Sequence, residues 1–174
     1  MIKIILLALI ALIAAVLALA ATRPGSFRVE RSIRINAPPE KILPLINDFH
    51  QWGVWSPYEK LDPTMSRAYS GAPAGIGAVY EWQGNSKAGT GHMEIIAALP
   101  TQTLIKLDFS KPFTAHNIAG FTAEPDGTAT RLTWSMEGPS PFVARLLGLF
   151  FNMDQMIGGE FATGLTKLKA VAEQ

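Results

Sequence analysis

Between Pro141 and Glu173, hydrophobic residues recur at intervals of three and four. This spacing predicts one long amphipathic helix, because such positions share one face of a helix with 3.6 residues per turn. That face consists of Phe142, Leu146, Phe150, Met153, Ile157, Phe161, Gly164, Leu168 and Val171. Three glycines, at 158, 159 and 164, interrupt the helix, and each costs about 0.5–1 kcal/mol relative to alanine. They indicate either close packing against a sheet or a bend around a bound molecule. We expect the bend or close approach at Gly158-Gly159.

The N-terminal segment is the longest uninterrupted apolar run. Residues 4–21 contain no polar side chain and follow Lys3. As a helix they would span about 27 Å, close to the ~30 Å hydrocarbon core of a bilayer. The small residues of Ala18-Leu19-Ala20 also fit a cleaved signal peptide, but the apolar cores of signal peptides are usually only about 7–15 residues long. We therefore predict an uncleaved transmembrane anchor over residues 1–22, a linker over 23–26 and one domain over 27–174.

The charges flanking this anchor give opposing indications of membrane sidedness. Lys3 and the terminal amino group favour a cytoplasmic N-terminus, whereas Arg23, Arg28 and Arg31 follow the span closely and favour the reverse. A signal-like start favours export of the domain. We expect a single-pass membrane protein whose domain faces the exported side, and the orientation stays open.

Alternating apolar and polar residues predict a series of strands. In residues 27–35, Phe27, Val29, Ile33 and Ile35 share one face, and Arg31 is the charged residue on it. Further strands are expected over residues 78–84, 89–98, 103–110, 116–123 and 128–137. The connections are short, and the turn Glu124-Pro125-Asp126-Gly127 is typical of a tight reversal. Consecutive strands joined in this way predict an antiparallel meander.

A helix and an aromatic segment separate the first strand from the others. Asn36-Ala37-Pro38-Pro39-Glu40 predicts a helix start, because proline suits the first turn and Glu40 complements the helix dipole. An irregular segment containing three aromatic residues and then a loop over 70–77 follow this helix. A sheet with one apolar face needs a cover, and the C-terminal helix is the expected one. The predicted fold class is therefore α+β.

Several segments in this order resemble the START-like superfamily, in particular its polyketide cyclase/dehydrase-like branch, the SRPBCC proteins. They are ERSIRINAPPEKI, WGVWSPYEKLDP, YEWQGN, GTGHMEI, LDFSKPF, TRLTWSMEG and MDQMIGGEFATGLTKLK, spread over about residues 27–172. Membrane-tethered members with one N-terminal apolar helix are similar to the whole chain. The resemblance implies a helix-grip (Bet v 1-like) fold, in which an antiparallel sheet wraps around a long C-terminal helix and leaves a hydrophobic cavity. It also implies binding or transformation of lipids, sterols, polyketides or other apolar molecules.

Composition narrows the possible functions. Fifteen basic and fourteen acidic residues nearly balance and form no basic patch, so nucleic acid is not an expected partner. The absence of cysteine excludes disulfides, thiol nucleophiles and cysteine-ligated zinc. His50, His92 and His116 lack the spacing of a metal motif, so we expect no metal site. The glycines match neither a dinucleotide-binding nor a phosphate-loop pattern, and no cofactor is expected.

Aromatic and apolar residues are the candidate ligand contacts, because small-molecule sites are mostly apolar with a few placed polar groups. Each also fits an ordinary core position. The candidates are Trp52, Trp55, Tyr80, Trp82, Phe109, Phe121, Trp134, Met136, Met153, Ile157 and Phe161. Trp52, Trp55 and Tyr58 lie in the irregular segment, where they would gate a cavity, touch the bilayer interface or pack that loop.

Polar candidates are few, and we assign no catalytic residue. His92 and Glu94 point to the same side of a strand, which suits proton transfer but is more typical of a wet outer face. Asp108 and Lys106 are expected to form a surface charge pair, and Glu160 flanks the helix stripe. Arg31 would hold an acidic ligand group or, as we favour, pair with a carboxylate.

The sequence therefore predicts a membrane-tethered domain that binds a hydrophobic small molecule or lipid in an internal cavity. One alternative is a polyketide cyclase/dehydrase-like enzyme acting on an apolar substrate. That alternative needs an ionisable residue in the cavity, and His92, Glu94 and Glu160 are its candidates. The other alternative is a structural module whose core is filled by its own side chains.

Overall fold

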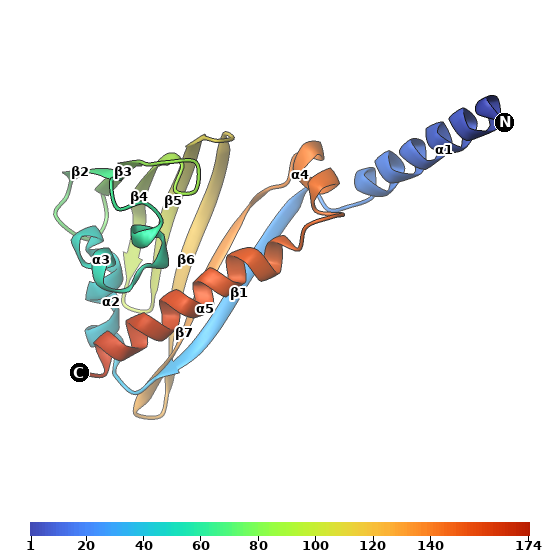
Figure 1. The fold of residues 1–174 in the computed structure, drawn as a ribbon. Coiled ribbons are helices and arrows are strands. Elements are labelled where there is room, and N and C mark those ends of the chain that lie inside the picture. The colour runs from blue at the N-terminus through green and yellow to red at the C-terminus, as the bar shows by residue number, and fades with distance from the viewer.

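A seven-stranded antiparallel sheet and the helix that crosses it form the body of the protein (Figure 1). The structure, a computed structural model, describes residues 1–174. The strands lie in the order β1-β7-β6-β5-β4-β3-β2. Their bounds are β1 (Ser26–Ile35), β2 (Ser66–Gly71), β3 (Ala78–Gln83), β4 (Thr90–Leu99), β5 (Gln102–Lys111), β6 (Ala115–Asp126) and β7 (Ala129–Pro139). The helices are α1 (Ile2–Ala21), α2 (Pro39–Asn47), α3 (Trp52–Trp55), α4 (Phe142–Leu147) and α5 (Met153–Ala172), with short 3-10 turns at Phe49–Gln51 and Pro57–Lys60.

The first strand pairs with the last one. Ser26 lies opposite Pro139 and Ile35 lies opposite Thr130, so β1 and β7 match along their whole lengths. The start of β1 and the end of β7 are therefore neighbours at one end of the sheet. This pairing places α1, which precedes β1, beside α4, which follows β7 (Figure 1). We call this the anchor end of the sheet and the opposite end the distal end.

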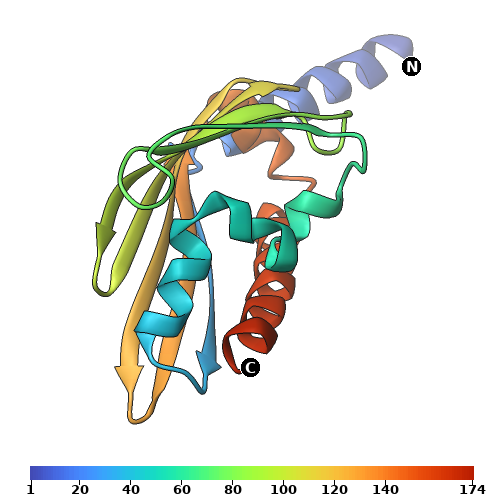
Figure 2. The ribbon, with the colours of Figure 1, turned by 90° about the vertical axis from the view of Figure 1, so that its left-hand side faces the viewer.

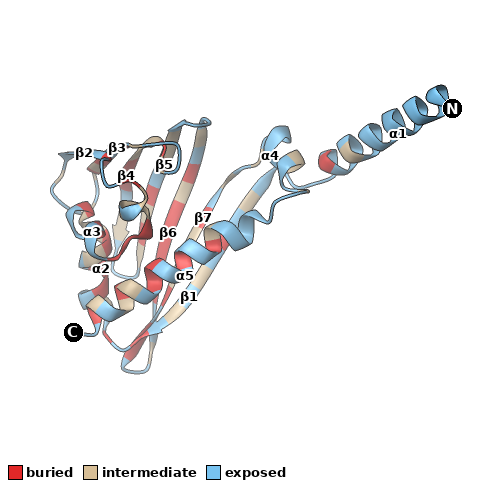
Figure 3. Cartoon of the chain, in the orientation of Figure 1, coloured by how far each residue is buried: buried red, intermediate tan, exposed pale blue.

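The sheet curves around its helices. Figure 2 shows α2, α3 and α5 on the concave side. A single cluster of 27 buried hydrophobic residues fills the space between these layers, and burial is concentrated on the strands and on the C-terminal part of α5 (Figure 3). This arrangement confirms the predicted α+β helix-grip fold with a long C-terminal helix.

The prediction of one unbroken helix from Pro141 to Glu173 was wrong. Gly148 ends α4, and α5 begins after Asn152, whose side-chain Oδ1 accepts a hydrogen bond from the Gln155 amide at 3.0 Å. The chain therefore breaks at residues 148–152, whereas α5 continues without a break through Gly158-Gly159, where a bend or a close approach was expected. The apolar stripe is correspondingly divided. Phe142, Phe150 and Met153 are exposed, and full burial begins only at Gly158 and Phe161.

Two of the three helix glycines are explained by close approach. A Cβ at Gly164 would lie 2.8 Å from the Trp134 ring and 2.9 Å from Pro57. A Cβ at Gly158 would collide with the guanidinium of Arg31. Gly159 faces open space, with no atom within 4 Å of a Cβ built there. The structure therefore favours packing against the sheet over a bend as the reason for Gly158 and Gly164.

The sequence analysis missed strand β2. All six of its residues are exposed, so it lacks the alternation that revealed the other strands. It lies at the edge of the sheet and pairs with β3 from Ser66 opposite Gln83 to Gly71 opposite Ala78. Its hydrogen bonds to β3, rather than burial, hold it in place.

Alanine substitutions at two glycines of α5 should have opposite effects on stability. We expect Gly164→Ala to lower the free energy of unfolding by about 1–3 kcal/mol, because the added methyl overpacks the contact with Trp134 and Pro57. Gly159→Ala should raise it by about 0.5–1 kcal/mol, because the site is open and alanine favours the helix. Urea unfolding of the detergent-solubilised full chain, followed by circular dichroism, measures both. Equal effects of the two substitutions would contradict the close approach at Gly164.

Candidate functional site

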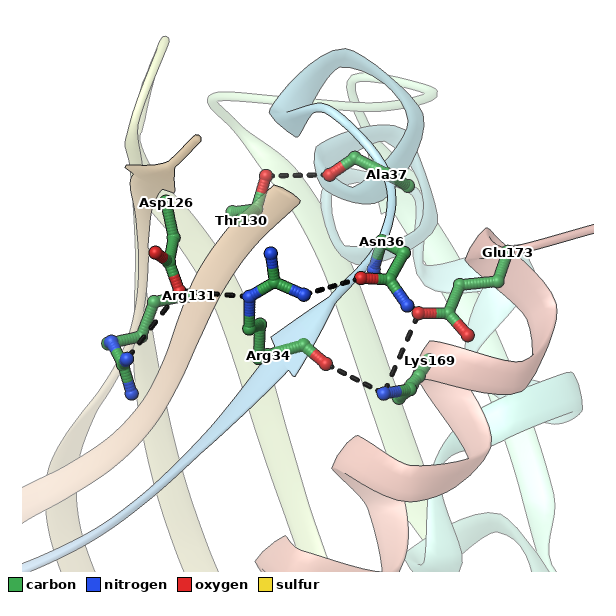
Figure 4. Close-up of polar contacts among 8 residues, drawn as sticks. All are labelled: Arg34, Asn36, Ala37, Asp126, Thr130, Arg131, Lys169 and Glu173. Carbon is green, nitrogen blue, oxygen red and sulfur yellow. Dashed lines mark hydrogen bonds and ion pairs between the residues drawn. The ribbon is translucent and has the colours of Figure 1, made fainter. Parts of the chain in front are cut away.

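A polar network closes the distal end of the concave face (Figure 4). The backbone N–H of Asn36 donates to Glu173 Oε1 at 2.6 Å, and Lys169 Nζ donates to the Arg34 carbonyl at 2.9 Å. These bonds tie the last turn of α5 to the end of β1. At the start of β7, Thr130 Oγ1 donates to the Ala37 carbonyl at 2.7 Å.

Arginine 34 extends this network across the sheet. Its Nε donates to Asp126 Oδ2 at 3.1 Å, and a second nitrogen donates to Asn36 Oδ1 at 2.7 Å. Asp126 also pairs with Arg131, at 3.5 Å. The distal end is thus held by bonds that join β1 to α5 and to the ends of β6 and β7 that meet there.

An ion pair positions the other end of α5. Arg31, on the concave side of β1, forms a two-pronged contact with Asp154, with N–O distances of 2.8 and 3.1 Å. The hydrogen bond from Arg31 holds the pKa of the Asp154 carboxyl below its usual range. This pairing with a carboxylate confirms the role that the sequence favoured for Arg31.

Stacked aromatic rings fill the middle of the concave face. Phe161 of α5 lies parallel to Trp134 of β7, with a centroid distance of 4.2 Å and an interplanar angle of 9°. Phe121 stacks on the opposite flank at 5.0 Å, and Trp55 meets Trp134 edge-on at 5.5 Å. Such contacts add about 0.5–1.5 kcal/mol each beyond burial of their area. This part of the interior is filled by the protein itself.

Burial decreases along the strands from the distal end toward the anchor end. On β7 the exposed fraction rises from 0% at Leu132 to 3% at Trp134 and 9% at Met136. On β5 it rises from 0% at Ile105 to 9% at Leu107, and Phe109 beyond them is only partly buried. Because the register aligns these positions at the same end of the sheet, the concave face is less fully buried toward α1.

We call this less fully buried end of the concave face the apolar mouth. It is defined by Trp82, Leu107, Phe109, Asn117 and Met136. Trp82 meets Phe109 edge-on at 5.5 Å. Asn117 is 7% exposed and contributes an amide to an otherwise apolar surface. Leu107 and Asn117 were absent from the predicted ligand contacts, although each shares its strand face with a predicted residue, Phe109 and Phe121 respectively.

Two buried polar atoms in the core have no hydrogen-bond partner in the protein. They are the Trp134 indole Nε1 and the Ser56 hydroxyl oxygen. Both side chains are at least 97% buried, Trp134 at 3% exposure and Ser56 at 1%. An unpaired buried donor costs about 1–3 kcal/mol, so both groups are suited to an acceptor that the protein does not supply. Ser56 carries no sequence signal that would have identified it.

A second polar group lies at the edge of the interior. The Tyr80 hydroxyl donates to Glu59 Oε1 at 2.6 Å, and Arg67 Nε donates to Glu59 Oε2 at 2.6 Å. Burial, reinforced by the Glu59 carboxylate, raises the pKa of Tyr80 above its usual range. Arg67 neutralises the carboxylate, and the tyrosine is held as a protonated donor. This arrangement fixes the position of Tyr80 instead of leaving a free acid or base.

The predicted ionisable candidates do not lie on the concave face. His92 and Glu94 alternate with buried Met93 and Ile95, so they lie on the convex side. Glu160 belongs to α5, where its side chain is exposed rather than buried against the sheet.

Other charged residues on the convex side form the surface contacts that the sequence predicted. Lys106 Nζ lies 3.1 Å from Asp108, which confirms their expected charge pair. A hydrogen bond from His116 holds the pKa of Asp108 below its usual range. The enzyme alternative therefore loses the residues on which it depended.

Most of the predicted ligand contacts come together in one place. Eight of the eleven are buried in the core cluster: Trp52, Trp55, Tyr80, Trp82, Phe121, Trp134, Met136 and Phe161. Phe109 and Ile157 are partly buried and pack against that cluster. Met153 is 49% exposed at the start of α5. Their role as ligand contacts stays a prediction.

Two surface hollows lie outside this interior. One of about 170 Å³ is at the β2–β3 edge, beside His50 and Tyr69. The other, about 700 Å³, is lined mostly by outward-facing residues that include Arg28, His116 and Glu137. Arg28 and Glu137 are ion-paired at 2.7 Å. The ion pair in its lining makes this hollow less suited to an apolar molecule than the mouth is.

Comparison with known proteins gives a family and a fold. The sequence profile of a family described as "Polyketide cyclase / dehydrase and lipid transport" matches residues 26–173. No curated protein matches the chain.

Solved structures share the fold at low sequence identity. A protein from Chromobacterium violaceum is 16% identical with a TM-score of 0.59, and the match covers 87% of this chain and 99% of that one. A protein from Mesorhizobium loti is 19% identical with a TM-score of 0.59, covering 83% and 96% of the two chains. Ara h 8.0201 is 15% identical with a TM-score of 0.52, and the match covers 85% of this chain and 98% of that one. At such identities the likeness concerns the fold alone.

Removing the Ser56 hydroxyl should not destabilise the protein. We expect Ser56→Ala to leave the free energy of unfolding unchanged or raise it by about 1 kcal/mol, because the hydroxyl is buried without a partner. Thr130→Val is the matched control, since the buried Thr130 hydroxyl does have a partner, and its loss should cost about 1 kcal/mol or more. Urea unfolding of both variants measures the difference. A loss at Ser56 equal to that at Thr130 would show that Ser56 is paired.

Proposed function

The chain belongs to the polyketide cyclase / dehydrase and lipid transport family, and from this membership we propose that it is a membrane-tethered domain that binds a hydrophobic small molecule or lipid. The guest lies at the apolar mouth and reaches toward the aromatic stack on Trp134. The single observation that carries the proposal is the loss of burial along β5 and β7 toward the anchor end. A core that served only stability would gain from closure at both ends.

The chemistry of the mouth supports an apolar guest with one polar end. Trp82, Leu107, Phe109 and Met136 offer rings, an aliphatic side chain and a thioether, which adapt to different apolar shapes. Asn117 at the mouth, together with the unpaired Trp134 Nε1–H and Ser56 hydroxyl deeper in the core, are available to a hydroxyl, carbonyl or carboxylate. A few polar groups among many apolar ones fix orientation in such sites.

Membrane tethering is proposed from α1. It is the one helix long and apolar enough to cross a membrane, and almost none of it is buried against the rest of the protein. A helix of this length and composition is not stable in water without a partner for its apolar surface. The bilayer supplies that partner and keeps the domain at its surface.

Native mass spectrometry tests whether the mouth holds a guest. The full chain, released from detergent micelles, should carry a bound mass or take up added oleic acid, the probe for an apolar molecule with a polar end. Met136→Trp should weaken oleate binding by about tenfold, because filling the site costs about 1–3 kcal/mol and 1.4 kcal/mol is a factor of ten. The bound fraction over a titration measures this change.

The control is Ile118→Trp, which adds the same ring to the convex side of the neighbouring strand β6. It should bind oleate as the unaltered protein does. Equal losses in both variants would mean that the mouth is not the site. An empty protein that takes up no oleate would favour the alternative of a structural module with a filled core.

A further inference from the structure

The segment between β7 and the buried part of α5 exposes an unusual amount of apolar surface. Val143 and Leu147 of α4, and Phe150 and Phe151 after it, are 64%, 45%, 68% and 57% exposed. Phe142 is also exposed, and most of α4 has the colour of exposed residues in Figure 3. A contiguous apolar patch of this kind on a soluble surface marks a contact with another molecule or with a membrane.

This segment is joined directly to the end of α1. Helix α4 packs against α1 and buries Ala20 completely. Arg145 of α4 donates to the Arg23 carbonyl at 3.2 Å and to the Ala21 carbonyl at 3.4 Å, which caps the C-terminal end of α1. The exposed segment therefore begins where the apolar helix ends, and Figure 1 shows α4 at the base of α1.

The charge pattern of the segment suits a lipid surface. From Gly138 to Met153 the one charged residue is Arg145, and its guanidinium is turned toward α1. No acidic side chain would repel anionic lipids there. The free cation nearby is Arg23, which directly precedes the linker proline. Aromatic and aliphatic side chains beside basic residues are typical of segments that lie in the headgroup region of a bilayer.

We propose that α4 and residues 148–152 form a membrane-contact segment, which lies in the interface of the bilayer that α1 spans. The inference rests on the proposed anchoring by α1. Phe150 and Phe151 insert beside the lipid headgroups, and Arg145 fixes the segment to the base of α1.

This contact also narrows the class of guest. Beyond the break at residues 148–152, the apolar stripe resumes on α5 with Met153 and Ile157 and reaches buried Phe161. An apolar molecule passing from the bilayer to the core could remain on that stripe and need not enter water. The guest class is therefore a membrane-soluble lipid, drawn from the same bilayer.

Depth-dependent fluorescence quenching tests the contact with the full chain in phosphatidylcholine–phosphatidylglycerol vesicles. The chain has no cysteine, so single cysteines carry an environment-sensitive NBD label without further changes. The test variant is Phe151→Cys. The matched control is Leu99→Cys, at the distal end of β4, because the two side chains have similar exposure, 57% and 53%. Leu7→Cys reports on α1. We expect the Phe151 label to shift to the blue and to lose emission to nitroxides near the headgroups, and the Leu99 label to do neither.

The outcomes separate the contact from the anchor. Quenching at Leu7 by deep nitroxides without quenching at Phe151 would overturn the membrane-contact segment and leave the anchor intact. No quenching at Leu7 would overturn the anchor itself. A blue-shifted Phe151 label that lipid nitroxides do not quench would mean that a second copy covers the segment, which also overturns the proposal. Quenching at Leu99 equal to that at Phe151 would mean unspecific adsorption and would overturn it as well.

Discussion

The stacking of α5 on Trp134 is the contact on which the rest of the structure depends. Phe161 lies parallel to the indole, and Gly164 lets the helix backbone approach the same ring. This close approach sets the height of α5 above the sheet, because any side chain at Gly164 would push the helix away. The Arg31–Asp154 pair and the bonds of Lys169 and Glu173 then fix the direction of the helix. Together they hold α5 at both ends and at one point between.

This fixation leaves the concave face asymmetric. At the distal end, polar bonds between α5, β1 and the β6–β7 turn close the interior. Toward the anchor end the Arg31–Asp154 pair is the polar link between α5 and β1, and Leu107 and Met136 are each 9% exposed. The core is therefore less fully buried at the anchor end than at the distal end. The anchor end lies beside α1 because β1 begins and β7 ends there.

Local patterns revealed most of the fold but not the features that form the site. Alternation located six strands, and composition located α1, since both signals lie within short stretches of sequence. Strand β2 escaped because all its residues are exposed. The break at residues 148–152 was missed because the helical spacing of apolar residues continues through it. Spacing alone does not show where a helix is interrupted. Two features depend on the register between segments that are distant in sequence: the pairing of Phe161 with Trp134, and the end at which the core is less buried. A single sequence does not specify that register.

The linker limits what the domain is able to do in a cell. Four residues, Thr22–Gly25, separate α1 from β1, and they span at most about 14 Å even when extended. The Arg23 and Gly25 carbonyls are further bonded to Arg145 and Ser140. A protein that carries a ligand between two membranes needs either a long linker to its anchor or no anchor. If α1 spans a bilayer as proposed, the domain stays at one place on that membrane, and a guest has to diffuse to its base.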